Sequence, residues 1–281
     1  MQTIIITTDF SEPSLNAIKF AAALTKPLGV DHIVLYHSYG NVLVGTDIPV
    51  STEVDIAAAH ERSLQSLEDM EKELRQALGK DAGVQVELAA NSLPLIIGVE
   101  QLAKQQDASL VVAGATGKSG LERVLMGSNT TSLASEIQTP LLIVPKDARY
   151  KNIDKIVFAC DLKKLSRSAP VAEIGNWLER LNAQLLVLNL SLEGKRFDTD
   201  TIPGQYKMHD LLDAFSPEYH YAETDDIADE IEDFAEDQDA GLIITIPKSY
   251  GFFEGLFHRS VSKRLIRESD IPLLLLRERE A

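Results

Sequence analysis

Four residues between positions 114 and 128 have the types and the spacing that bind phosphate. Gly114 and Gly117 are separated by two residues, and nine further residues lead to the pair Gly127–Ser128. Gly114 ends an apolar run, and Gly117 permits a tight turn or a positive φ. Gly127–Ser128 opens a helix-like segment, with Ser128 as a good N-cap, and free N–H groups at a helix start attract anions. The spacing therefore predicts that the first glycine pair receives ribose or phosphate and the second holds outer phosphates.

Two better-known glycine loops do not fit this stretch. The Gly-Lys-Ser sequence at 117–119 suggests a P-loop, which requires another glycine five residues before its Gly-Lys pair. Val112 occupies that position, inside an expected strand. The dinucleotide fingerprint G-x-G-x-x-G fails as well, because Thr116 rather than glycine follows Gly114 by two residues.

The elements that would position these residues alternate between strand and helix. In the first half we expect strands at 3–8, 32–37, 84–89, 109–114 and 141–144, and helices at 13–27, 52–78, 93–105 and 128–137. Apolar strand runs with little alternation indicate a parallel sheet that is buried on both faces. Such a sheet carries helices on both faces and binds ligands outside the carboxyl ends of its strands, where the strand order reverses.

The chain also repeats itself. The sequence "DASLVVAG…IQTPLLIVP" at 107–145 aligns without a gap with "DAGLIITI…SDIPLLLLR" at 239–277, at a constant offset of 132 residues. The strand "IIITTDF" at 4–10 likewise resembles "IVFACDL" at 156–162. We therefore expect two homologous domains, residues 1–147 and 151–281.

The second copy lacks the glycines. At the same offset, Ile246 replaces Gly114, Ser249 replaces Gly117 and Arg259 replaces Gly127, whereas Ser260 preserves Ser128. Bulky side chains would fill the space in which a nucleotide must lie. We expect the second half to bind no ATP in this manner, and to serve in structural pairing or to take a different ligand.

Composition restricts the remaining possibilities. The net charge of −16 argues against a nucleic-acid binder, and the apolar runs are too short for a membrane span. The start of the chain has no features of a signal peptide. Cys160 is the single cysteine, which favours a buried inert thiol and a cytoplasmic location. The acidic stretch 223–240 is interpreted as a solvated helix face, and the histidines show no spacing typical of a metal site.

The segments "TTDFSEPSLNAIKFA" and "LYH" and the pattern G-x2-G-x9-G-[S/T] together resemble the universal stress protein family. The resemblance covers essentially the whole chain. It implies two tandem Rossmann-like domains, similar to adenine nucleotide alpha hydrolases, each an α/β fold with a five-stranded parallel sheet of order 3-2-1-4-5. Members with the full motif bind ATP, with or without Mg²⁺.

The resemblance also assigns nucleotide contacts to individual residues. These are Thr7 and Asp9 for the adenosine, His37 and Ser38 for the adenine through backbone groups, Ala113, Gly114 and Gly117 for the ribose and α-phosphate, and Gly127, Ser128, Asn129 and Thr130 for the outer phosphates. Two alternatives stay open on the residues themselves. Asp9 would equally serve as a cap for the following helix, and the glycines would serve in plain turns.

The function expected from these features is that of a nucleotide-binding regulatory protein in a stress response. No catalytic constellation is found, so we expect at most slow, incidental ATP hydrolysis. The alternatives are a ligand-free interaction scaffold and, less favoured, an adenylate-forming enzyme on a related fold. In the resembled family the last strands mediate dimer contacts, so we expect an intrachain pseudo-dimer or a homodimer, with an unknown protein partner.

Overall fold

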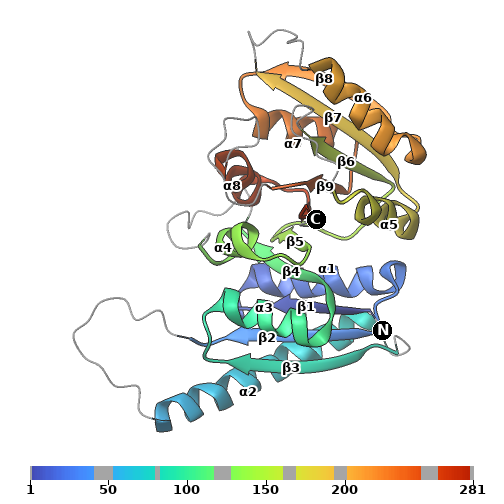
Figure 1. Ribbon diagram of the computed structural model, residues 1–281. Coiled ribbons are helices and arrows are strands. Elements are labelled where there is room, and N and C mark those ends of the chain that lie inside the picture. The colour runs from blue at the N-terminus through green and yellow to red at the C-terminus, as the bar shows by residue number, and fades with distance from the viewer. Residues whose placement is uncertain are drawn as a thin grey trace, which may run out of the picture. The chain divides into compact units, whose positions relative to one another are not determined.

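The computed structural model describes residues 2–40, 53–79, 83–116, 128–160, 169–192, 201–247 and 259–278 (Figure 1). The chain forms two compact units. One contains the described residues up to Ala115 together with Ser128–Asp147, and the other contains those from Ala148 onward. These are the N-terminal and the C-terminal unit.

The N-terminal unit is a parallel sheet with alternating helices. Its elements are β1 (Thr3–Thr7), α1 (Glu12–Leu28), β2 (His32–Ser38), α2 (Glu53–Leu78), β3 (Gln85–Asn91), α3 (Leu95–Gln106), β4 (Ala108–Ala115), α4 (Ser128–Glu136) and β5 (Leu141–Pro145). The strands pair in the order β3-β2-β1-β4-β5, and every pairing is parallel. The predicted order 3-2-1-4-5 is confirmed.

The C-terminal unit repeats this plan. Its elements are β6 (Lys155–Cys160), α5 (Val171–Leu181), β7 (Gln184–Leu192), α6 (Thr201–Leu212), a short 3₁₀ helix η2 (Asp213–Phe215), β8 (Glu218–Thr224), α7 (Ile227–Asp237), β9 (Leu242–Thr245), α8 (Arg259–Glu268) and β10 (Leu273–Leu275). The order is β8-β7-β6-β9-β10, again all parallel. It matches the N-terminal unit strand for strand, so the predicted tandem α/β fold is confirmed.

The two units also share polar details at corresponding positions. The buried Glu232 of α7 accepts a hydrogen bond from the backbone N–H of Asp270 at 3.1 Å. Glu100 of α3, 132 residues earlier, accepts one from the N–H of Gln138 at 2.7 Å. Each glutamate thereby satisfies a backbone group just after the last helix of its unit. This repetition shows that the glutamates are structural.

The core is formed by the strands and by one face of each helix. All five residues of β1 and all five of β5 are buried, as expected for strands covered on both sides. In α2, Leu67 and Leu74 are fully buried, whereas Ile56 near the start of the helix is 42% exposed.

None of the helices within the described residues is both long enough and apolar enough to cross a membrane.

The ends of β2 and β3 are joined through one tightly packed tyrosine. Tyr36 is fully buried, and its hydroxyl donates to Oδ1 of Asn91 at 2.8 Å. Gly98 of α3 lies directly against it, because a Cβ at residue 98 would be 1.8 Å from the tyrosine oxygen. Gly98 is therefore required by packing and not by a turn.

We expect Gly98→Ala to lower the free energy of unfolding by about 1–3 kcal/mol, the usual cost of overpacking. Tyr36→Phe removes the nearest atom and should cost about 1 kcal/mol for the lost hydrogen bond. The double variant should lose less than the sum of the two, as measured by urea unfolding. Additive losses would show that the tyrosine hydroxyl is not what excludes a side chain at residue 98.

Candidate functional site

The carboxyl ends of β1 and β4 are where the strand order of the N-terminal unit reverses. The chain leaves β1 toward β2 on one side, and β4 and β5 continue the sheet on the other. In parallel sheets this is the place where ligands bind. The start of α1 and the start of α4 both contact the end of β4 here, as described below. The predicted site residues that the structure describes all belong to this edge of the sheet.

The turn between β1 and α1 is closed by side chains. Oδ1 of Asp9 accepts hydrogen bonds from the backbone N–H of Ser11, at 3.1 Å, and from the Ser11 hydroxyl. Ser11 is the N-cap of α1, and its hydroxyl accepts from the N–H of Ser14 at 3.4 Å. Asp9 thus orients the capping residue, and the alternative that Asp9 itself caps the helix is wrong because Ser11 is the cap. Asp9 is also exposed, so the contact with adenosine stays a prediction.

Buried hydroxyl groups fix the end of β1. Thr7 donates to the carbonyl of Val112 in β4 at 3.2 Å, so its side chain joins the two strands that flank the switch point. Oγ1 of Thr8 accepts from the N–H of Phe10 at 3.0 Å and lies 2.9 Å from the hydroxyl of Ser14. The predicted role of Thr7 beside the adenosine is untested, but its hydroxyl is already used within the sheet.

Phe10 has a backbone conformation that the sequence did not predict. Its φ is 66°, in the left-handed region, which costs a residue with a Cβ roughly 1–2 kcal/mol. The other described non-glycine residues with positive φ are at or just after helix ends; they are Asp107, Asn182, Ser216 and Asp239. Sequence reasoning missed Phe10 because no glycine or asparagine marks the position.

The end of β2 places His37 next to this turn. Its Nδ1 lies 2.8 Å from the carbonyl oxygen of Thr8, and because a carbonyl only accepts, Nδ1 carries the proton. The His37 ring packs on Phe10 with 4.3 Å between centroids. Ser38 donates its hydroxyl to the carbonyl of Leu93 at 2.6 Å. Both side chains therefore bind protein, and the predicted backbone contacts with adenine stay untested.

The end of β4 is glycine for a reason different from the one the sequence suggested. A Cβ at Gly114 would lie 2.5 Å from the carbonyl carbon and oxygen of Pro13, in the first turn of α1. The space that a side chain would need is thus already filled by the backbone of α1. The carbonyl of Gly114 accepts the Thr130 hydroxyl at 3.0 Å, which ties the first turn of α4 to the strand. Ala113 is buried, at 2% exposure.

The start of α4 supplies the remaining described candidates. Ser128 is the first helical residue rather than the cap before it, and Asn129 is exposed. The hydroxyl of Thr131 is buried and has no hydrogen-bond partner among the residues that the structure describes. Gly117 and Gly127 lie outside the described residues, so the loop that the spacing assigned to phosphate is not part of this geometry.

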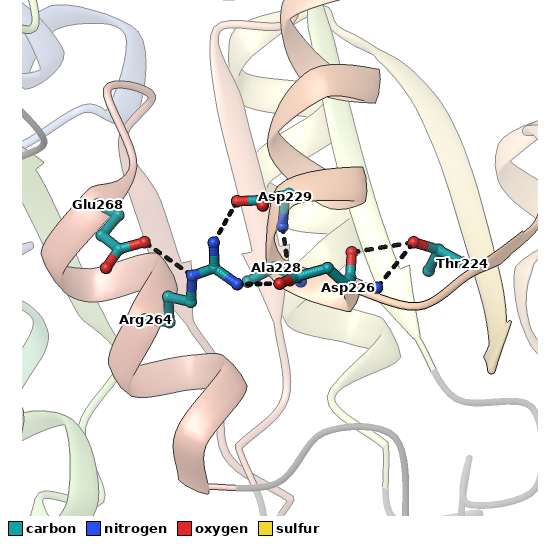
Figure 2. A network of polar contacts seen from close by, with 6 residues as sticks. All are labelled: Thr224, Asp226, Ala228, Asp229, Arg264 and Glu268. Carbon is teal, nitrogen blue, oxygen red and sulfur yellow. Dashed lines mark hydrogen bonds and ion pairs between the residues drawn. The ribbon is translucent and has the colours of Figure 1, made fainter.

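The C-terminal unit has an ion-pair network near its corresponding edge (Figure 2). The guanidinium group of Arg264, in α8, binds Asp226 and Asp229 at the start of α7 and Glu268 one turn along its own helix, the last two at 2.6 and 2.7 Å. Asp226 is also the N-cap of α7. At the matching N-terminal positions the sequence has Ser132, Pro94 and Ile97 in place of Arg264, Asp226 and Asp229.

The network changes the charge properties of Asp226. The hydrogen bond from Arg264, followed by the backbone N–H groups at the start of α7, holds the pKa of this carboxyl group below its usual value. Folding stability from this group is therefore present above the ordinary aspartate pKa of about 3.9 and is lost as the pH falls through the lower folded value. The only sequence signal for the network was the spacing of four residues between Arg264 and Glu268, which places two side chains side by side on a helix.

The acidic stretch 223–240 forms the end of β8 and helix α7, and Asp229, Asp233 and Glu236 on this helix are exposed. Carboxylate oxygens of Glu232, Glu236 and Asp270 lie within 4.8 Å of one another. Since Glu232 repeats the structural hydrogen bond of Glu100, this grouping follows from the fold. The thiol of Cys160 is buried, 3.8 Å from the sulfur of Met208, as predicted for an inert cysteine.

Comparison with known proteins adds the following findings. The family model described as "Universal stress protein family" matches residues 1–145 and 152–277. A universal stress protein of Methanocaldococcus jannaschii is 28% identical over 143 residues, which cover 51% of this chain and 81% of that protein. The crystal structure of a universal stress protein from Archaeoglobus fulgidus matches with a TM-score of 0.72 and 17% identity, over 99% of this chain and 98% of that one.

A universal stress protein solved in complex with cAMP also matches, with 18% identity and a TM-score of 0.37, over 52% of this chain and 97% of that chain.

The Arg264 network leads to a testable difference between two neighbouring aspartates. We expect Asp226→Ala to cost about 1–2 kcal/mol of unfolding free energy, because it removes a helix cap as well as an ion pair. Asp229→Ala removes only an exposed ion pair and should cost about 0.5 kcal/mol or less. Urea unfolding measures both costs. In Asp226→Ala, hydrogen exchange should speed up at the backbone N–H groups of Ala228 and Asp229, which in the wild type donate to the Asp226 carboxylate at 3.1 and 3.3 Å.

The pH dependence of folding stability provides the control for the two aspartate substitutions. Wild-type protein should lose stability as the pH falls below about 4, and Asp226→Ala should lose less over the same range. Equal costs for the two substitutions, or identical acid profiles, would contradict the role assigned to Asp226.

Proposed function

Because the chain belongs to the universal stress protein family, we propose that its N-terminal unit binds one adenine nucleotide, ATP, and that the protein acts as a regulator in a stress response. The observation that carries the proposal is the position of α4. Its first turn is tied to the end of β4 by the hydrogen bond from Thr130 to Gly114. The start of a helix is thus held at the strand-order switch point, where a phosphate chain would meet free N–H groups.

Further features of the same edge support the proposal. The buried hydroxyl of Thr131, without a partner among the described residues, lies in the first turn of α4. Asp9 is exposed at the end of β1, where it would reach the ribose or adenine. The glycine spacing from Gly114 to Gly127 is the pattern that the sequence predicts to receive phosphate. Mg²⁺ would accompany the nucleotide and be held chiefly by its phosphates.

In the same proposal the C-terminal unit takes no ATP. Ile246, which follows β9, carries a side chain where the N-terminal unit has Gly114. Arg259, the first residue of α8, stands in the sequence where the N-terminal unit has Gly127, so the second glycine of the motif is absent as well. The start of α7 is instead linked to α8 by Arg264. This unit then contributes stability and an interaction surface.

We further propose that the protein is not an enzyme, and that any ATP hydrolysis is slow and incidental. Regulation would act through a protein partner that senses the nucleotide state, and the chain would assemble as a homodimer. The cytoplasm is the proposed location, since it keeps a single cysteine reduced. Size-exclusion chromatography with light scattering would measure the assembly.

The decisive test is calorimetric titration of the purified protein with ATP after removal of bound nucleotide. We expect one site per chain, and nucleotide in the supernatant when protein as purified is denatured. Gly127→Arg places the residue of the second half at the start of α4 and should weaken ATP binding at least about tenfold, because it fills the space at the helix N-terminus.

Arg259→Gly is the matched control. It should leave the stoichiometry at one, because Ile246 still stands where the N-terminal unit has Gly114. Undiminished ATP binding by Gly127→Arg would refute the site, and an absence of any nucleotide binding by wild type would favour a ligand-free scaffold. Rapid pyrophosphate release with a small substrate would instead identify an adenylate-forming enzyme.

A further inference from the structure

Two aromatic rings meet at the carboxyl edge of the N-terminal unit. Phe10 follows β1 and His37 is next to last in β2, and their ring centroids are 4.3 Å apart with the planes tilted by 42°. Both residues are half-buried. A ring pair with partly exposed surfaces therefore lies beside the strand ends at which the nucleotide is proposed to bind.

The local backbone does not require a phenylalanine at residue 10. Its φ of 66° is one that glycine adopts without strain. The hydrogen bonds of the turn come from Thr8, Asp9 and Ser11 and from the backbone N–H of residue 10, so they would persist without the aromatic ring. Strain of this kind often accompanies a functional site. The ring itself must therefore account for the strained position.

The hydrogen bond of His37 does not require an imidazole either. Asn189 occupies the position in β7 that His37 occupies in β2. Asn189 stands five residues after Gln184, and His37 stands five residues after His32. Both strands pair in the same register with the first strand of their unit. The side-chain amide of Asn189 donates to the carbonyl of Cys160 at 3.1 Å. This bond is equivalent to the one from His37 to Thr8, so asparagine suffices to tie the two strands together.

Both rings are missing from the unit that also lacks the glycines. The alignment of 4–10 with 156–162 places Leu162 opposite Phe10, and the strand register places Asn189 opposite His37. In both units, therefore, the residue at the position of His37 ties the second strand to the first. The aromatic pair occurs only beside the intact glycine motif.

We propose that Phe10 and His37 form the platform on which the adenine ring of the nucleotide stacks. This inference rests on the proposed function and specifies which side chains recognise the base. Stacking of a base on an aromatic side chain strengthens binding independently of the contacts that the phosphates make. The platform therefore adds affinity for nucleotides but none for a phosphate chain without a base.

The test transplants the residues of the C-terminal unit, as Phe10→Leu and as His37→Asn. Calorimetry with ATP should show binding weakened about tenfold or more by each substitution, in line with the loss of one stacking contact. Inorganic tripolyphosphate, which has no base, should bind each variant as it binds wild type. His37→Asn retains a donor for the Thr8 carbonyl, so the strand pairing should survive.

Asp107→Gly is the control for backbone strain. Asp107 also has a positive φ, of 48°, but at the end of α3, on the opposite edge of the sheet. This variant should raise the melting temperature and leave ATP binding unchanged, which would show that a change in stability alone does not alter affinity.

The possible results distinguish a failure of the platform from a failure of the proposed nucleotide binding. Wild type that binds no ATP would overturn both. Wild type that binds ATP, with both variants equal to it, would overturn the platform and leave the nucleotide site standing. Equal losses for ATP and tripolyphosphate would show that the rings only support the fold, which also overturns the platform.

Discussion

The close approach of the first turn of α1 to the end of β4 is the constraint on which the edge of the N-terminal unit depends. Because a Cβ at residue 114 would lie 2.5 Å from the backbone of Pro13, the strand must end in glycine for the helix to start there. The carbonyl of that glycine then accepts the hydroxyl of Thr130 in α4. Two helix starts thereby meet one strand end. In the C-terminal unit Ile246 stands in place of this glycine. Helix α5 begins eleven residues after the end of β6, whereas α1 begins five residues after the end of β1.

The fold could be predicted from the sequence because its signals are spread over many residues. Apolar strand runs, the periodic helices and the offset of 132 residues all indicate the same tandem parallel architecture. The candidate edge could be predicted too, since glycines and a helix start follow the fourth strand. What could not be predicted is how individual side chains are used. Gly114 was assigned to a ligand, but backbone packing already requires it, and the hydroxyl of Thr7 binds Val112. Such contacts join residues far apart in the chain, so no local pattern carries them.

The two units show which parts of this architecture are scaffold and which are specific. Glu100 and Glu232 form the same bond at the same place, and so do His37 and Asn189 despite their different chemistry. The differences lie at the carboxyl edges. One unit has glycines and two rings there, and the other has an arginine bound to three carboxylates. These differences between the copies lie at the carboxyl edges, while the two polar contacts named above are common to both units.

The central position of β1 affects how the protein is made. The hydrogen bond from Thr7 to Val112 joins residues 105 positions apart, and β1 has no neighbour on that side until β4 has left the ribosome. At about 5–20 residues per second, translation takes on the order of 5–20 s to cover this interval. During that time one edge of β1, all five residues of which are buried in the folded unit, stays unpaired, so the nascent chain exposes an open strand edge until β4 is made.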